Sequence, residues 1–244
     1  MIKQIVHIES CGSTNAEVFR YHAKMQNKTP FVLYCDTQSK GRGMGKNTWD
    51  SQSKKNLTCS IVQYPAFLSP YRHFYFSMTV ALSIHDTLKN MGLNSRIKWP
   101  NDLLVNNQKI CGILIESEMQ NDNIRMMVAG IGININQTDF PAVYPKPVSL
   151  KSLGISHTNP KVVLNALVSA FDDRYRQIES ENYSEIKQAY LKRLIGFHEW
   201  KRYETNNEVF KARITDVQDN GFLCLKHADG THSKHEMKEI KMII

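Results

Sequence analysis

The stretch from residue 96 to residue 136 constrains the fold more than any other part of the chain. It contains four runs that favour β-strands: RIKW, DLLV, KICGILIESEM and IRMMVAGIGININ. The connections between them are short and carry turn-forming residues, namely Pro100, the pair Asn106-Asn107 and the segment 120–123. Short loops of this kind favour antiparallel hairpins. The sequence therefore predicts consecutive antiparallel strands here.

Helices and further strands are predicted on both sides of that stretch. Apolar and β-branched runs predict strands at 2–8, 31–35 and 56–64. Helices are expected from Thr14, which opens a Thr-x-x-Glu capping box, from Pro70 to a stop at Gly92, from Asn159-Pro160 to about 178, and over 183–194. The expected fold is α+β, with a mixed/antiparallel sheet flanked by helices.

The pattern of the sequence changes at Gly196, from helix-forming segments to short β-like runs. These runs are separated by the turn signals Asn206-Asn207, Asp219-Asn220-Gly221 and Asp229-Gly230. We therefore expect two domains, a main domain over 1–195 and a small antiparallel β-barrel over 196–244.

Cysteine content and hydrophobic runs bear on the compartment. The 244 residues include five cysteines, an odd number without a CxxC pair, which indicates a reducing environment rather than a disulfide framework. No stretch approaches 18 consecutive apolar residues, and the N-terminus lacks the features of a signal peptide. A soluble, cytoplasmic protein without a membrane span is expected.

Positive charge is concentrated in one glycine-rich segment, KGRGMGKNTW (40–49). The chain has a net charge of +8, and residues 38–56 carry five cations against Asp50. Such a focus attracts phosphate, carboxylate or nucleic acid; the alternative is a solvated lysine-rich loop. The spacing fits neither a Walker A loop nor G-x-G-x-x-G. The glycines nevertheless allow backbone N–H groups to approach an anion, Arg42 offers a planar fork, and Trp49 could stack on a ring.

Three other clusters are candidates for ligand contact, each with a structural alternative. In KWPND (98–102), Asp102 suits a metal or ribose hydroxyl and Asn101 a carbonyl, or the segment is a plain turn. Lys109 and Gly112 suit an anionic ligand close to the backbone, or a strand start with a bulge. Asn134 needs partners from a ligand or from the protein.

The segment Ser13-Thr14-Asn15 lies where a helix begins, and free N–H groups there could bind an anion or a polar head group. Helix capping explains Thr14 but neither of its neighbours. A last cluster, Cys224, His227, His232 and His235, suggests zinc, but its three-residue spacings on strands place the ligands on opposite faces. No metal site is therefore expected.

Taken in order, these motifs resemble the biotin–protein ligase family. The shared pattern is S-T-N (13–15), Q-S-K-G-R-G (38–43), Trp49, K-W-P-N-D-L (98–103), K-I-C-G-I-L-I-E (109–116) and G-I-G-I-N (130–134). It covers roughly residues 5–195, and the β-rich tail is similar to the family's C-terminal domain. The resemblance implies a class II synthetase-like biotin/lipoate ligase catalytic domain followed by an SH3-like barrel.

The resemblance also implies a two-step ligase reaction. Biotin and MgATP would give biotinyl-5′-AMP, and a lysine of a biotin carboxyl carrier protein of the acetyl-CoA carboxylase type would then accept the biotin. Arg42, Lys98 and Lys109 would supply the cations that such a reaction between anions needs.

Roles for individual residues follow from the same resemblance. The implied biotin-binding residues are Ser13, Thr14, Asn15, Gln38, Arg42, Gly43, Met44, Lys109 and Gly112. The implied ATP-binding residues are Arg42, Trp49, Lys98, Asn101, Asp102, Lys109 and Asn134. Arg42, Lys109 and Asp102 are the expected catalytic residues. No protein-bound metal is expected, since Mg²⁺ comes with ATP, with Asp102 as its nearest candidate carboxylate.

The chain departs from the family pattern in its glycine-rich segment. Met44 stands where many members have Arg or Gln, so the cation count is lower, and Lys46 is expected to substitute in part. The pattern begins almost at residue 1, which predicts no helix-turn-helix and no operator DNA binding. A homodimer is left open. Two alternatives also remain, a lipoate or octanoate ligase of related fold and a basic nucleic-acid-binding module.

Overall fold

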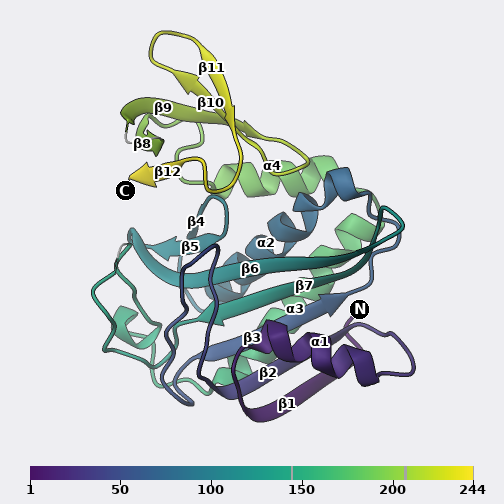
Figure 1. Cartoon of the computed structure of the whole chain (residues 1–244). Helices are drawn as coiled ribbons and strands as arrows, with labels where there is room; N and C mark the ends of the chain where they lie inside the picture. Colours follow the sequence, from purple (N-terminus) through teal and green to yellow (C-terminus); the bar gives the residue numbers. More distant parts are fainter. Residues whose placement is uncertain (144, 206–207, 244) are drawn as a thin grey trace.

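Two β-sheets organise the molecule (Figure 1). The computed structural model describes residues 1–143, 145–205 and 208–243. The larger sheet has the strand order β1-β2-β3-β7-β6-β5-β4. Its strands are β1 (Gln4–Cys11), β2 (Phe31–Gln38), β3 (Leu57–Gln63), β4 (Arg96–Lys98), β5 (Asp102–Val105), β6 (Gln108–Gln120) and β7 (Asn123–Ile133). Only the pair β1-β2 is parallel among the described strands, so the prediction of a mixed sheet is confirmed.

The predicted hairpins between residues 96 and 133 are present. β4, β5, β6 and β7 pair in sequence order, each antiparallel to the next. The turn at Asn106-Asn107 has positive φ angles of 50° and 62°, and Asn121-Asp122 has 50° and 58°. Asn and Asp adopt this left-handed region more readily than most residues, which explains why these two turns are tight.

Helices cover both faces of this sheet. They are α1 (Thr14–Lys24), α2 (Phe74–Asn90), α3 (Pro160–Glu179) and α4 (Tyr183–Arg193), with short 3-10 turns at Pro70–Arg72 and Lys151–Leu153. Each predicted helix is present, and Asn159 caps α3 by accepting the N–H of Lys161 at 2.9 Å. The capping box predicted at Thr14 is wrong. Ser13 is the N-cap residue, and its side chain makes no capping hydrogen bond.

Period-two alternation divides the apolar residues of the sheet between two cores. Met127 and Ala129 on β7 belong to the larger core with α2 and α3. Met126 and Val128, which alternate with them, belong to a smaller core under α1, together with Leu33 and other residues of β2 and β3. Successive side chains of a strand point to opposite faces, so β7 serves both layers.

The face under α1 changes character beyond the N-terminus of that helix. On β7 the series Met126, Val128 continues as Gly130 and Gly132, and on the antiparallel neighbour β3 Val62 gives way to Ser60. The first part of the face is filled by α1. The second part has bare backbone and small polar groups, and this leaves room for a site.

The C-terminal sheet is antiparallel, with the order β11-β10-β9-β8-β12. Its strands are β8 (Lys201–Thr205), β9 (Glu208–Val217), β10 (Leu223–His227), β11 (His232–His235) and β12 (Lys241–Ile243). The small β-unit was predicted, but its two described edges, β11 and β12, do not pair to close a barrel. The predicted turn Asn206-Asn207 lies outside the described residues. The domain division at 195/196 stays a prediction, since the buried residues of both sheets form one continuous cluster.

The turn at Asp219–Gly221 fastens the C-terminal sheet to the rest of the molecule. The Asp219 carboxylate accepts the hydroxyl of Tyr75 at 3.0 Å and lies 3.8 Å from the ammonium of Lys187. The indole N–H of Trp99 donates to the carbonyl of Gly221 at 3.1 Å. The KWPND turn is therefore held directly against the C-terminal sheet.

The described part of the chain offers neither a membrane-spanning helix nor a metal cluster. None of the described helices is long and apolar enough to cross a bilayer. No group of three His, Cys, Asp or Glu side chains among the described residues is placed to hold a metal. In the histidine-rich tail, the Nε2 atoms of His227 and His235 lie 2.7 and 2.8 Å from the hydroxyl oxygen of Ser233.

Candidate active site

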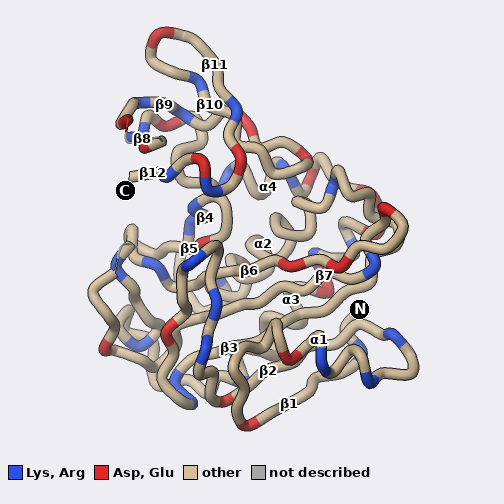
Figure 2. The backbone as a smooth tube through the Cα atoms, in the orientation of Figure 1, with Lys and Arg blue, Asp and Glu red and all other residues tan. Residues whose placement is uncertain are grey.

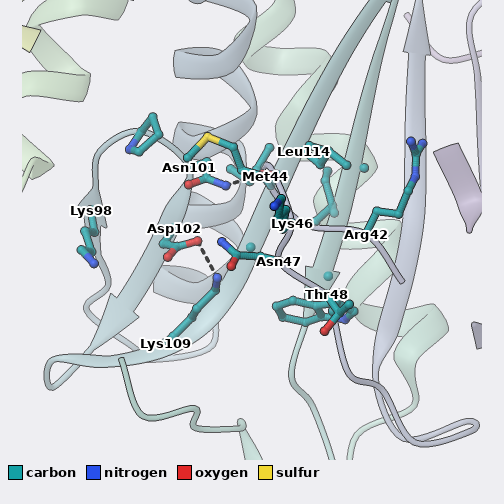
Figure 3. Close-up of a pocket in the computed structure, with 18 of the residues that line it drawn as sticks. Arg42, Met44, Lys46, Asn47, Thr48, Lys98, Asn101, Asp102, Lys109 and Leu114 are labelled. Carbon is teal, nitrogen blue, oxygen red and sulfur yellow. Dashed lines mark hydrogen bonds and ion pairs between the residues drawn. The ribbon is translucent and has the colours of Figure 1, made fainter. Parts of the chain in front are cut away.

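A cavity of about 600 Å³, called the central cavity below, lies on the part of the sheet that α1 leaves uncovered. All but one of the predicted site residues line it (Figure 3). They are Ser13, Thr14, Asn15, Gln38, Arg42, Gly43, Met44, Trp49, Lys98, Asn101, Asp102, Lys109 and Gly112. The sequence motifs therefore meet in space although they span nearly one hundred residues.

Uncharged polar groups at the N-terminus of α1 form one end of the cavity. The backbone N–H of Thr14 donates to Oε1 of Gln38 at 2.9 Å. The Asn15 amide donates to Glu116 at 2.7 Å, and its oxygen accepts the hydroxyl of Ser60 at 2.6 Å. These bonds fix the orientation of the Asn15 amide, which is 2% exposed. A side chain held by several partners is suited to recognising one fixed pattern of donors and acceptors.

Gly130 gives Asn15 its space. A Cβ atom at Gly130 would lie 2.5 Å from the side-chain oxygen of Asn15. Only a glycine allows the strand and the amide to approach this closely. Packing against Asn15 therefore explains why the first residue of the GIGIN motif, Gly130, is a glycine.

Positive charge gathers at the other end of the cavity. The Lys109 ammonium lies 2.7 Å from Oδ1 of Asp102, as the dashed line in Figure 3 marks. Lys98 is 8% exposed, and its pKa is lowered, first by burial and then by the charges of Lys109 and Lys241, against the opposing effect of Asp102. An anion entering here would favour the charged form of Lys98 and oppose this lowering of its pKa. Asn101 supports the turn by donating to the carbonyl of Ile113 at 2.8 Å.

The glycine-rich segment, called the lid loop (residues 39–50), forms a small hairpin over the cavity. The N–H of Trp49 donates to the carbonyl of Gly41 at 3.0 Å, and that of Gly43 to the carbonyl of Asn47 at 2.8 Å. Gly41 cannot be replaced without strain, because a Cβ there would lie 2.2 Å from the carbonyl oxygen of Trp49. Figure 2 shows basic positions along this loop.

Arg42 is bound to a carboxylate of the protein. Its guanidinium donates to Glu116 at 2.7 Å, at the same Oε2 atom that accepts the Asn15 amide. In Figure 3 the side chain extends away from the Asp102–Lys109 pair. Glu116 therefore links the lid loop to the polar end of the cavity. The contacts expected of Arg42 with a carboxylate and an α-phosphate stay predictions.

Trp49 packs its ring against two glycines that pair across β6 and β7. A Cβ at Gly132 would overlap its indole ring at 2.2 Å, and one at Gly112 would approach it to 3.1 Å. The Lys109 ammonium lies 5.8 Å from the ring centroid, within the range of a cation–π contact. The two glycines thus form a floor for an aromatic ring; adenine stacking on Trp49 stays a prediction.

Asn134 is the predicted site residue that the structure places elsewhere. It is 2% exposed and is not part of the described cavity wall. Its amide donates to the backbone carbonyls of Lys109 and Val148, at 3.3 and 3.1 Å. The ATP contact expected of Asn134 has no support from the cavity wall and stays a prediction. Its amide N–H groups hold the start of β6 in place.

A sequence model of the biotin/lipoate A/B protein ligase family matches residues 8–134, slightly more than half of the chain. The chain belongs to this family. The match ends before the C-terminal sheet, which agrees with the motifs that line the central cavity from Ser13 to Gly132.

Individual relatives extend this result. The bifunctional ligase/repressor BirA of Bacillus subtilis is 28% identical over 217 residues, which are 86% of this chain and 66% of that protein. The biotin--[acetyl-CoA-carboxylase] ligase of Paracoccus denitrificans is 29% identical over 225 residues, 89% of this chain and 92% of that protein. The chain thus spans about two thirds of the Bacillus relative.

The fold is shared with solved structures over the whole chain. The structure of a biotin protein ligase from Aquifex aeolicus in complex with biotin and ATP matches it with a TM-score of 0.80, over 99% of both chains and at 20% identity. This likeness includes the C-terminal sheet and confirms the predicted fold class, that of a biotin/lipoate ligase.

Several residues of this ligase-family site were missed from the sequence. Glu116 and Ser60 hold Asn15, and Lys238, Ile240, Lys241 and Met242 bring the C-terminal sheet into the cavity wall. Glu116 could have been found, because period-two spacing from Gly112 places it on the cavity face. Nothing in the sequence connects residues 238–242 with a motif more than one hundred residues away.

Proposed function

We propose that the chain is an ATP-dependent biotin–protein ligase. The observation that supports this most directly is the charge of the central cavity. Six cations line it, Arg42, Lys46, Lys98, Lys109, Lys238 and Lys241, against the single described carboxylate of Asp102. The opposite end is lined by the uncharged polar residues Ser13, Thr14, Asn15 and Gln38. A reaction between a carboxylate with a neutral polar head group and a nucleoside triphosphate needs both environments side by side.

In the first step, a carboxylate oxygen of biotin attacks the α-phosphorus of ATP. A phosphorus–oxygen bond forms, the bond to the bridging oxygen of the β-phosphate breaks, and pyrophosphate leaves. Both reactants are anions, so the site must supply fixed positive charge rather than a base. Lys109 and Lys98 meet the α-phosphate, and Arg42 exchanges Glu116 for biotin's carboxylate as the lid loop closes. Binding both reactants in one cavity supplies their orientation.

In the second step, the neutral ε-amine of a carrier lysine attacks the carbonyl carbon of biotinyl-5′-AMP. A carbon–nitrogen bond forms, AMP leaves, and the amine releases a proton. We propose a biotin carboxyl carrier protein as the acceptor, of the acetyl-CoA carboxylase type that the name of the Paracoccus relative specifies. The lid loop keeps water from the mixed anhydride until the carrier arrives.

Magnesium fits this site as a companion of ATP. Mg²⁺ prefers oxygen ligands, keeps several waters, and binds through one or two carboxylates plus phosphates. Asp102, the described carboxylate of the cavity, would be that ligand. The ion would neutralise phosphate charge when ATP is bound.

Ser13, Thr14, Asn15 and Gln38 are proposed to bind the ureido ring of biotin. Their fixed donors and acceptors match a group that carries two N–H donors and one carbonyl acceptor. This end of the cavity also argues against a lipoate ligase. The ring of lipoate has no N–H or carbonyl groups, so it would leave these polar side chains without hydrogen-bond partners.

The cellular setting is part of the same proposal. The five cysteines are all free thiols, which supports a reducing compartment such as the cytoplasm. Absence of operator binding and formation of a homodimer both stay predictions.

Pyrophosphate exchange into ATP tests the proposed function. The exchange is measured with biotin, with lipoate and without any acid. We expect exchange that depends on biotin. Exchange that occurs with lipoate but not with biotin would show that lipoate is the substrate. If neither biotin nor lipoate supports exchange, the ligase assignment is wrong. A DNA titration at two salt concentrations tests the nucleic-acid alternative, for which tight and strongly salt-dependent binding is required.

A further inference from the structure

Lys238 occupies an unusual position between the C-terminal sheet and the lid loop. It lies between β11 and β12 and lines the central cavity as well as two neighbouring cavities around the lid loop. A Cβ built at Gly45 of the lid loop would lie 3.9 Å from its side-chain Cε. In Figure 2 basic positions lie both on the lid loop and on the segment that leads into β12.

The charge of Lys238 is available to a ligand. Arg42 and Lys109 are each bound to a carboxylate, Glu116 and Asp102 respectively. No ion pair or hydrogen bond engages the ammonium of Lys238 within residues 1–143, 145–205 and 208–243, and its side chain is exposed. Lys46, on the other side of Gly45, is likewise without an ion pair in that part of the chain. Lys46 and Lys238 both line the central cavity and a neighbouring cavity beside the lid loop.

The backbone at Lys238 is also unfavourable for a lysine. Its φ angle is +83°, in the left-handed region that favours glycine. A lysine at such a position costs conformational free energy, and no ion pair of its side chain within the described residues offsets this cost. Strain held next to a cavity is an observation that points towards a role for the side chain.

We propose that Lys238 is a phosphate-binding residue, which contacts the β- and γ-phosphates of ATP across the lid loop. This inference rests on the proposed function. Lys109 and Lys98 lie at the KWPND turn, where the α-phosphate reacts, so the outer phosphates extend towards the mouth of the cavity. Lys46, on the lid loop, and Lys238, in the segment between β11 and β12, meet them there. The C-terminal sheet thereby contributes a substrate contact and is more than a support.

Replacement by glycine separates charge from strain. Lys238→Gly removes the ammonium but suits the left-handed backbone, so the free energy of unfolding should not fall. We expect the KM for ATP in biotin-dependent exchange to rise about tenfold, the effect of losing one charge-assisted hydrogen bond. Lys238→Arg should stay within about threefold of the wild type because it keeps the charge. Lys234→Ala, an exposed lysine of β11 that lines none of the three cavities, is the matched control and should leave the KM unchanged.

The half-reactions locate the effect. Transfer of biotin from preformed biotinyl-5′-AMP to the carrier involves neither the β- nor the γ-phosphate, so Lys238→Gly should leave its rate within about twofold of the wild type. A loss confined to this transfer would overturn the proposal. So would a KM for ATP equal to that of the wild type, or an equal change in Lys234→Ala.

A binding measurement keeps the test independent of the ligase assignment. Inorganic pyrophosphate is titrated into the wild type, Lys238→Gly and Lys234→Ala by calorimetry. Weaker binding in Lys238→Gly alone supports the phosphate contact, and equal binding in all three proteins contradicts it. The wild type could bind pyrophosphate and yet show no biotin-dependent exchange. That result would contradict the proposed function but not the phosphate contact of Lys238.

Discussion

The face of the large sheet under α1 has two halves that use the same strands differently. In the core half, Met126, Val128 and Val62 are fully buried against α1. In the site half, the same faces of β7 and β3 carry Gly130, Gly132 and Ser60. The strands do not bend away or end; only the side chains change.

The comparison shows how a fold can acquire a cavity without losing its frame. Hydrogen bonds between strands hold both halves, because they do not depend on side chains. The core half is further stabilised by buried apolar side chains, whereas the site half lacks this contribution. Its glycines instead admit Asn15 and Trp49 to the backbone. Substitutions in the core half should therefore change stability, and substitutions at the site half should change binding or catalysis.

The largest effect is expected at Lys109, which borders the site half. Lys109→Ala removes a cation that stabilises charge in the transition state and should slow adenylate formation by about a thousandfold. The free energy of unfolding should change little, because the side chain is partly exposed. Lys146→Ala, an exposed lysine on the neighbouring segment whose carbonyl accepts the N–H of Lys109, is the control. Near-normal exchange in purified Lys109→Ala would show that its assigned role is wrong.

The core half is tested by Met126→Ala. The side chain is fully buried under α1, so its truncation leaves a cavity and should lower the free energy of unfolding by about 3 kcal/mol. The KM values for biotin and ATP should stay unchanged while the protein is folded. Met119→Ala, at a position 47% exposed, should cost little. Chemical denaturation and exchange kinetics on the same samples measure both quantities. A raised KM for biotin would mean that the two halves are coupled.

The sequence predicted these elements well because their signals are local. The hairpins from residue 96 to residue 133 depend on Asn-rich turns, and α3 begins where Asn159-Pro160 sets it. The capping box failed because it competes with the site: the N–H of Thr14 is taken by Gln38, twenty-four residues away. The sequence could not show whether the C-terminal strands close into a barrel, because the pairing of the first and last strands depends on residues far apart in the chain.

The site was predictable where residues lie within motifs, and less so where it depends on packing. Motif order placed thirteen residues in the cavity wall. The place of Asn134 outside the cavity wall could not be predicted, because the sequence does not reveal that its amide N–H groups donate to the carbonyls of Lys109 and Val148. Lys238 was missed because its proximity to Gly45 results from the docking of two sheets. Tertiary packing decides such contacts.

A smaller effect, mainly on binding, is expected at Gly130. Gly130→Ala would bring a methyl group to 2.5 Å from the oxygen of Asn15, which is held on several sides and cannot retreat. We expect the KM for biotin to rise about thirtyfold, because the displaced amide loses its alignment. The change in unfolding free energy should be below that of Met126→Ala. Gly12→Ala is the control, since the nearest atom to its new methyl group is at 4.0 Å. If the two variants have equal KM values for biotin, Asn15 does not contribute to biotin recognition.

The smallest effect is expected at Ser60, whose hydroxyl donates to the oxygen of Asn15 at 2.6 Å. Ser60→Ala removes this bond without adding bulk, so the KM for biotin should rise only about fivefold, the scale of one neutral hydrogen bond. The effect should reach biotin through Asn15. In an Asn15→Ala background, Ser60→Ala should therefore change the KM for biotin very little, which a double-mutant cycle measures. Equal effects in both backgrounds would show that Ser60 touches the ligand itself or acts through the sheet. Met126, Val128 and Val62 of the core half have apolar side chains, so none of them has a side-chain hydrogen bond to remove.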